Sequence, residues 1–217
     1  MRQKQKRFEE NYARPNVLEP GKDLYEKIKG NWRSTMFGND NDLIVELGCG
    51  KGEYTIGLSR LFPNRNFIGI DIKGDRIWVG SKTAEDEELK NVAFLRTQLL
   101  YFEKFFDEGE ISEIWLTFPD PRPRDRDEKR RLTFPRYLQL YKSALKKDGW
   151  FRFKTDNTPL FDYTLEVLQD RFPVRNLSYT HDLYSSDMVA EHHGIKTKYE
   201  KIFSDKGEKI KYMKFQF

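Results

Sequence analysis

Two short segments of the chain carry residues that could bind a nucleotide-like cofactor. In the first, Leu43 to Gly52, an apolar run leads into a Glu-x-Gly-x-Gly-x-Gly loop that begins at Glu46. Glycines at alternate positions let the backbone turn tightly and approach a ligand with no Cβ in the way. In the second, Asp71 ends another apolar stretch, 19 residues after Gly52. A carboxylate at that place can accept hydrogen bonds from both hydroxyls of a ribose, so the two segments predict a cofactor site.

The spacing between the glycines and the acid fits either NAD or S-adenosylmethionine. Glu46 lies two residues before the first glycine, where it would repel a pyrophosphate but can meet an ammonium group. A chain of 217 residues is also too short for a dinucleotide domain and a separate substrate domain. We therefore expect S-adenosylmethionine, bound by Glu46, Gly48, Gly50 and Asp71.

A third segment, residues 118–124, combines a carboxylate with a stiff backbone. Prolines at 119, 121 and 123 restrict the chain around Asp120, which follows an apolar run that begins at Ile111. Six basic residues lie between positions 122 and 131. A basic run is often a solvated surface, but this one adjoins the predicted cofactor site, which favours contact with nucleic-acid phosphates. The candidates for RNA contact are Arg126, Lys129, Arg130 and Arg131.

Apolar runs that alternate with helical patterns must position these segments. The predicted buried strands are residues 43–47, 66–72, 92–95, 111–118 and 149–154. Strands alternating with helices indicate a parallel, doubly wound sheet, in which ligands bind beyond the carboxyl ends of the strands. Residues 209–217 alternate polar with apolar side chains, which suits an edge strand. The sequence thus predicts an α/β, Rossmann-like fold with a seven-stranded, mostly parallel sheet, helices on both faces and an antiparallel C-terminal edge strand.

Composition restricts the class of protein. Lys and Arg total 39 against 35 Asp and Glu, so any nucleic-acid signal must come from local clustering of charge. The single cysteine, Cys49, excludes an intrachain disulfide and favours a reducing, cytoplasmic location. No apolar run approaches the roughly 18 to 20 residues that span a bilayer. We expect residues 1–20 to form a flexible basic arm and residues 21–217 a single domain, in a monomer or a homodimer.

Taken in order, the motifs resemble those of the bacterial tRNA (guanine-N7-)-methyltransferases of the TrmB type. The matching segments are Glu46 to Gly52, Asp120 to Arg124, Asp127 to Leu132, Phe153 to Asn157 and Thr197 to Glu200. The resemblance covers about residues 30 to 217, and its Asp-Pro loop is far more specific than the glycine loop. It implies an enzyme that methylates N7 of a guanine at position 46, in the variable loop of tRNA, with S-adenosylmethionine as methyl donor.

The resemblance also implies roles for individual residues. Those expected to face the cofactor are Glu46, Asp71, Gln98 and Asp120. Those expected to contact the guanine or nearby RNA are Arg124, Asp156, Thr197 and Glu200. The chain departs from the family where Arg122 replaces a Trp, Arg124 a Lys, Asp127 a His, and Gln98 an acid or Asn. Arg124 keeps the charge but not the geometry of Lys, and Gln98 can still hydrogen-bond adenine.

These residues suit the chemistry of guanine N7, which carries a free lone pair and needs no deprotonation. The main tasks are then alignment and exclusion of water. The purine becomes cationic as the methyl group arrives, and we hypothesise that Asp120 stabilises this charge while it positions the base. Glu200 or Asp156 could accept hydrogen bonds from the N1–H and N2–H₂ edge of guanine. Leaving such acceptors unpaired would disfavour adenine by about 1 kcal/mol or more per bond.

Two other functions stay open from the sequence. The same fold could methylate another RNA, a protein amide or a small molecule, because the Asp-Pro loop is similar to the Asn/Asp-Pro-Pro-Tyr loop of amino-group methyltransferases. Alternatively, the chain could be an inactive RNA-binding subunit, although the presence of Glu46, Asp71 and Asp120 argues against this. A metal site at His192 and His193 is not expected, because adjacent histidines point in different directions.

Overall fold

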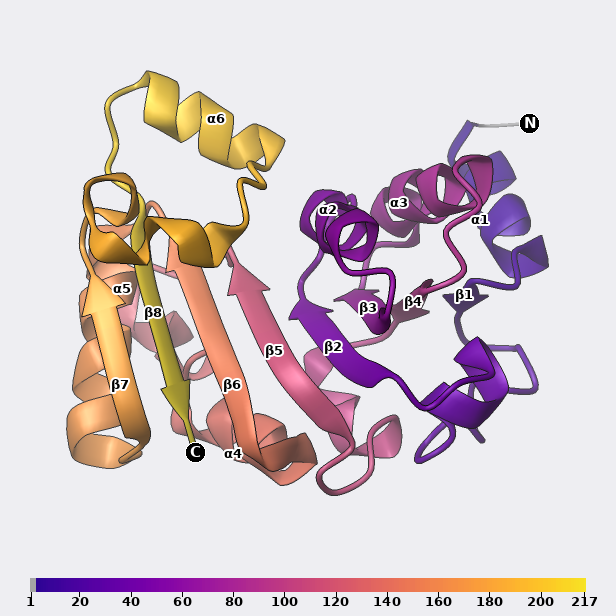
Figure 1. Cartoon of the computed structure of the whole chain (residues 1–217), viewed down its shortest axis with the longest axis horizontal. Coiled ribbons are helices and arrows are strands. Elements are labelled where there is room, and N and C mark those ends of the chain that lie inside the picture. Colours follow the sequence, from indigo (N-terminus) through magenta and orange to yellow (C-terminus); the bar gives the residue numbers. More distant parts are fainter. Residues whose placement is uncertain (1–2) are drawn as a thin grey trace.

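The computed structural model describes residues 3–217, which contain one eight-stranded sheet (Figure 1). Its strand order is β1-β4-β3-β2-β5-β6-β8-β7. The strands are β1 Val17–Leu18, β2 Asp42–Leu47, β3 Arg65–Asp71, β4 Val92–Arg96, β5 Ile111–Thr117, β6 Leu145–Thr155, β7 Arg175–Thr180 and β8 Lys211–Gln216. The first six strands pair in parallel, whereas β8 is antiparallel to both β6 and β7. The predicted mostly parallel α/β sheet is therefore confirmed.

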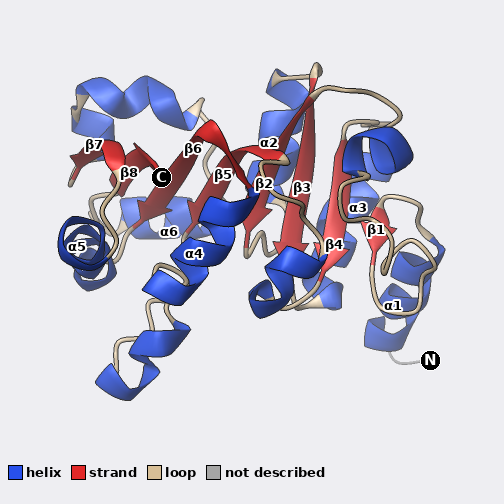
Figure 2. Cartoon of the chain, turned by 90° about the horizontal axis from the view of Figure 1, so that it is seen from below, coloured by secondary structure: helices blue, strands red, loops and turns tan. Residues whose placement is uncertain are grey.

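Helices cover both faces of the sheet (Figure 2). The α-helices are α1 Gln3–Ala13, α2 Glu53–Leu61, α3 Gly74–Asp86, α4 Pro135–Ala144, α5 Thr158–Glu166 and α6 Lys198–Asp205. Shorter helical turns are η1 Trp32–Phe37, η2 Leu99–Lys104, η3 Asp125–Arg130, η4 Val167–Arg171, η5 Leu183–Ser185 and η6 Asp187–His192. None of the helices within residues 3–217 combines the length and the apolar character needed to cross a membrane.

Two hydrophobic cores flank the sheet because its strands are apolar on both faces. In β2, Leu43, Val45 and Leu47 belong to the core under η1, η2, α4 and α5, whereas Ile44 belongs to the core under α2 and α3. Successive side chains of a strand point to opposite faces, which explains the alternation. Each fully buried aliphatic residue contributes about 1.5–3 kcal/mol relative to its exposed state. The central strands are thereby held rigidly beneath the loops at their carboxyl ends.

The strand count and the position of the last strand differ from the sequence prediction. The sheet has eight strands, because the short β1 pairs with β4 at one edge. β8 is antiparallel, as expected, but it pairs on both sides, so that β7 and not β8 forms the opposite edge. Five of the six residues of β8 are buried. The alternating pattern of this strand therefore reflects packing on two sides, and not a solvated face.

The N-terminal segment, expected as a flexible arm over residues 1–20, is part of the folded domain where it is described. α1 packs against α3, and the buried Asn11 side chain donates a 2.7 Å hydrogen bond to the carbonyl of Gly74. Arg14 forms a 2.9 Å ion pair with Glu85 of α3. These contacts use polar groups, which explains why a polar, basic composition did not reveal them. The first two residues of the expected arm lie outside the described residues.

Candidate active site

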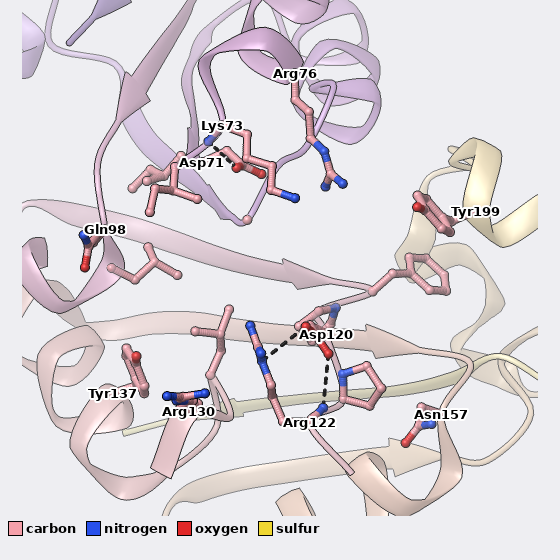
Figure 3. A pocket seen from close by; sticks show the side chains of 18 of the residues that line it. Asp71, Lys73, Arg76, Gln98, Asp120, Arg122, Arg130, Tyr137, Asn157 and Tyr199 are labelled. Atoms are coloured by element: carbon pink, nitrogen blue, oxygen red, sulfur yellow. Dashed lines mark hydrogen bonds and ion pairs between the residues drawn. The ribbon is translucent and has the colours of Figure 1, made fainter. Parts of the chain in front are cut away.

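The loops that follow β2, β3, β4, β5 and β6 surround a pocket of about 860 Å³ (Figure 3). Asp71, Gln98, Asp120 and Asp156 line it from four of these loops. Because neighbouring parallel strands end at the same edge, residues far apart in sequence meet there. An adjoining hollow of about 330 Å³ is lined by the glycine loop and Glu46. The structure thus brings together most of the residues predicted from the sequence.

The glycine loop and Asp71 are joined by a direct hydrogen bond. Gly48 and Gly50 have φ angles of +67° and +57°, and a Cβ at either position would meet no atom within 4 Å. Glycine is therefore favoured there by backbone conformation and not by lack of space. The N–H of Gly50 donates to Oδ2 of Asp71 at 2.9 Å, and the N–H of Lys73 donates to Oδ1 at 2.8 Å. These bonds orient the carboxylate while leaving lone pairs for ligand hydroxyls.

Glu46 lies behind the glycine loop and is almost fully buried. The N–H of Thr55 donates to its Oε2 at 2.9 Å, and the hydroxyl of Thr117 donates to its Oε1 at 2.6 Å. Burial raises the pKa of Glu46 to about 7, although the hydrogen bonds from Thr117 and Thr55 oppose this shift. A cation placed nearby would favour the charged carboxylate, so the position suits a ligand with an ammonium group.

The pocket also contains residues that the sequence-based prediction missed. Ile72, directly after Asp71, and Leu100, two residues after Gln98, line the pocket and are 54% and 42% exposed. Exposed aliphatic side chains in a concave site suit the flat apolar faces of a base. Lys73 and Arg76 point into the same pocket from the start of α3 (Figure 3). The sequence could have indicated Lys73 and Arg76, because they follow Asp71 closely and the chain that leaves β3 must pass the cofactor site.

Asp120 lies on the loop after β5, in the centre of the pocket wall (Figure 3). Its side chain is 61% exposed, and its Oδ2 lies 3.2 Å from Nε of Arg122. The N–H of Arg122 also donates to Oδ1 at 3.2 Å. Phe118 and Arg122 both have a φ of +48°, an uncommon backbone region for non-glycine residues. The loop is thus held in a strained form that presents the Asp120 carboxylate to the pocket.

The part of the pocket next to Asp120 carries residues suited to hold a base. Asp156 and Asn157 line it from the end of β6, and Tyr199 lines it from α6 (Figure 3). Burial raises the pKa of Asp156, and this carboxylate forms no ion pair with any residue of 3–217. The Tyr199 ring is 59% exposed. A partly desolvated acceptor and an exposed ring therefore face the same space as Asp120.

Thr197 and Glu200, predicted as a pair of substrate contacts, occupy different environments. Thr197 lines the hollow at the glycine loop, and its hydroxyl accepts the N–H of Glu200 at 3.1 Å, which caps α6. Glu200 is fully buried and does not line the pocket. Its carboxylate lies 2.7 Å from Nζ of Lys154, which is also fully buried, and accepts a hydrogen bond from the Tyr184 hydroxyl. The Glu200 side chain therefore points from α6 toward Lys154 of β6 and does not line the pocket in which the guanine was expected.

Arg130 lines the pocket and Arg124 does not, which is the reverse of what the sequence predicted. Arg124, predicted beside the guanine, does not line the pocket, and its Nε lies 2.9 Å from Oδ2 of Asp127. Arg130, predicted as an outer RNA contact, lines the pocket while its guanidinium lies 3.0 Å from the other oxygen of Asp127. The nearly buried Asp127 thus holds both arginines, and the turn η3 decides which of them faces inward.

The remaining basic residues of this segment differ in exposure. The Arg131 guanidinium lies 4.2 Å from the centre of the Tyr163 ring and is half-buried, so part of its role is structural. Arg126 and Lys129 are exposed and form no ion pair with other residues of the described chain. Arg126 and Lys129 are therefore two exposed, unpaired cations on η3 within the described chain, at the side of the pocket.

Comparisons with known proteins identify the family and the fold of the chain. A family model described as "Putative methyltransferase" matches residues 40–213. A tRNA (guanine-N(7)-)-methyltransferase of Cytophaga hutchinsonii is 48% identical over 217 residues, which cover all of this chain and 98% of the relative. The enzyme of that name from Christiangramia forsetii is 44% identical and covers 98% and 97% of the two chains. Among solved structures, the 16S rRNA methyltransferase KamB is similar in fold, with a TM-score of 0.64, 14% identity and coverage of 85% and 91%.

Proposed function

Because the chain belongs to the tRNA (guanine-N7-)-methyltransferase family, we propose that it transfers a methyl group from S-adenosylmethionine to N7 of a guanine in tRNA. The observation that carries this proposal is the single pocket in which Asp71 and the glycine loop meet Asp120, Asp156 and Tyr199. The target is position 46, in the variable loop, a point that rests on the resemblance to the family. The enzyme acts in the cytoplasm, a point that rests on the single cysteine.

The residues of the pocket fit S-adenosylmethionine in each of its parts. Asp71 would accept the ribose hydroxyls, and the Ile72 and Leu100 side chains would contact the faces of the adenine. Gly48 and Gly50 leave room beside the backbone, and Glu46 would meet the ammonium group. When bound, the cofactor supplies a methyl group that its sulfonium makes electrophilic. No protein base is needed, because N7 of guanine is already unprotonated.

Asp120 acts on the base that receives the methyl group. The purine gains a positive charge during the reaction, and a carboxylate in the pocket stabilises this charge more strongly than the neutral ground state. The two hydrogen-bonding contacts with Arg122 hold the Asp120 carboxylate in one direction before the substrate arrives. Stabilisation of this kind, together with alignment of the base, is the main contribution that the chain makes to the rate.

Asp156 and Tyr199 select and hold the guanine. The partial burial that raises the pKa of Asp156 also removes water from its carboxylate, so donors on the ligand are favoured partners. The N1–H and N2–H₂ groups of guanine supply two such donors on one edge, whereas adenine lacks both groups and has an acceptor at N1. The exposed ring of Tyr199 offers a surface on which a base can stack.

In vitro methylation tests the proposal. An unmodified tRNA transcript with a variable-loop guanine is incubated with the protein and labelled S-adenosylmethionine, and the RNA is then cleaved chemically at N7-methylguanine. The proposal predicts one cleavage site, at position 46, and no product when adenine replaces that guanine. Transfer of label to protein or DNA but not to tRNA would contradict it.

A further inference from the structure

A separate groove of about 530 Å³ lies between α2, α3 and residues 194–201. Its charged side chains are Lys51, Glu53, Arg60, Lys196 and Lys201. The excess of cations is not expected from the whole chain, whose two signs of charge nearly balance. This α2–α6 groove is therefore a local concentration of positive charge outside the proposed active site.

The lysines of the α2–α6 groove lack acidic partners. Lys51, Lys196 and Lys201 are exposed and form no ion pair with any other residue in the range 3–217. Among other surface lysines, Lys82 and Lys146 are paired, with Asp86 and Asp42 respectively, whereas Lys90 and Lys147 form no ion pair within the described residues. The Lys196 ammonium lies 4.3 Å from the centre of the Tyr184 ring, a contact that leaves its charge unneutralised. Unpaired lysines that line one hollow repel each other, so a bound anion would stabilise them.

Two acids moderate the charge of the groove without cancelling it. Glu87 lies outside the groove lining and pairs with Arg60, whose Nε donates to it at 2.8 Å. Glu53 lies in the groove, and its Oε2 accepts the backbone N–H of Lys198 at 3.0 Å. The groove lining therefore holds one carboxylate against three unpaired lysines, and it keeps a net positive charge.

The α2–α6 groove connects to the proposed active site. Lys51 and Glu53 line both this groove and the hollow at the glycine loop. Arg76 and Tyr199 line both that hollow and the 860 Å³ pocket that contains Asp120. Figure 1 shows α2 and α6 above the same end of the sheet. The free cations of η3 adjoin the other side of the pocket. A strand of RNA whose base enters the pocket would thus meet cations on both of its sides.

We propose that the α2–α6 groove binds backbone phosphates of the tRNA next to the methylated nucleotide. The inference rests on the proposed function, since it takes tRNA as the substrate. Lysine contacts to phosphates release condensed counterions and give affinity that does not depend on sequence. The groove would therefore orient the RNA and lower its KM without changing the chemistry at Asp120.

The test uses the double variant Lys196→Gln/Lys201→Gln, because both residues line the groove and neither lines the active-site pocket. KM for tRNA should rise roughly fivefold to tenfold at moderate salt, with kcat and the affinity for S-adenosylmethionine unchanged. The slope of log KM against log salt concentration should fall by about 0.7–0.9 for each phosphate that the variant no longer neutralises. The variant Lys196→Arg/Lys201→Arg keeps the charge and should keep the wild-type KM and slope.

A matched control is Lys90→Gln/Lys147→Gln, which removes two exposed charges near the amino ends of β4 and β6. It should leave KM and the salt slope unchanged. An unchanged KM in Lys196→Gln/Lys201→Gln, an equal effect of the control, or an equal rise of KM in the arginine variant would overturn the inference. Failure of the wild-type protein to methylate any tRNA would instead contradict the proposed function.

Discussion

Lys154 and Glu200 form an ion pair in which both side chains are fully buried, with 2.7 Å between Nζ and Oε1. The pair joins β6 to α6, the helix that carries Tyr199 to the pocket. Removing charges from water is costly, so a buried pair is stable only while both partners are present. Burial lowers the pKa of Lys154, and Glu200 opposes this shift. The pair therefore fixes the position of α6 above the active site.

Removal of either partner should destabilise the protein and misplace α6. Lys154→Met or Glu200→Gln leaves one buried charge or polar group uncompensated, at a cost of about 3–5 kcal/mol in the free energy of unfolding. Denaturation with urea measures this. The double variant Lys154→Met/Glu200→Leu removes both charges and should recover most of the stability and of kcat/KM for tRNA. A double variant that folds as well as the wild type but stays inactive would show that Glu200 contacts the substrate directly.

The buried Glu46 should couple cofactor binding to pH. Its pKa of about 7 lies above the ordinary value, so the free protein holds this carboxyl mostly protonated below pH 7. An ammonium group favours the carboxylate, so binding at pH 6 should release about one proton, and binding near pH 7.5 about a quarter of one. Affinity should rise as pH increases from 5.5 to 7. Titration calorimetry in buffers of different ionisation enthalpy measures the release.

Two controls isolate Glu46. In Glu46→Gln, affinity should be lower and nearly independent of pH between 5.5 and 7. Methylthioadenosine lacks the amino-acid end of the cofactor, and its binding to the wild type should release no proton. Proton release that persists in Glu46→Gln would assign the effect to another group.

Asp120→Asn should remove the stabilising charge while keeping the size of the side chain. We expect kcat to fall about 10²–10³-fold, because comparable electrostatic groups have effects of that size. Single-turnover methyl transfer at saturating tRNA measures it. The affinity for S-adenosylmethionine should change much less than the rate. A rate within twofold of wild type would exclude the electrostatic role of Asp120.

Tyr199→Ala should weaken tRNA binding because it removes the stacking ring. Stacking of a base on an aromatic side chain contributes about 1–3 kcal/mol, equivalent to a roughly fivefold to 150-fold rise in KM. Tyr199→Phe keeps the ring and should behave nearly as wild type. Equal defects in the two variants would point to the hydroxyl group and not to stacking.

The cofactor side of the site was predictable because short-range patterns place it. Asp71 is the last residue of β3 and Asp120 lies three residues after the end of β5, and the parallel strands of one sheet bring such positions to one edge. The glycine loop depends on the positive φ angles of its own glycines, and its hydrogen bond to Asp71 reaches only the neighbouring strand β3. These residues lie where the sequence predicted them.

The substrate side was less predictable because long-range packing decides it. The Thr-x-Tyr-Glu motif is compatible with either Glu200 or Tyr199 facing the pocket, and the distant Lys154 determines that Glu200 turns inward. β8 was misplaced for the same reason, since β7 pairs beyond it and covers an edge that the sequence left open.

The most direct test of the central proposal compares tRNA from cells with and without this protein. Chemical cleavage at N7-methylguanine is mapped by sequencing in the parent strain, a deletion strain, and deletion strains that express the wild type or Asp120→Asn. We expect cleavage at position 46 in the parent, its disappearance in the deletion strain, and its return with the wild type but not with the variant. Unchanged cleavage at position 46 in the deletion strain would contradict the proposal.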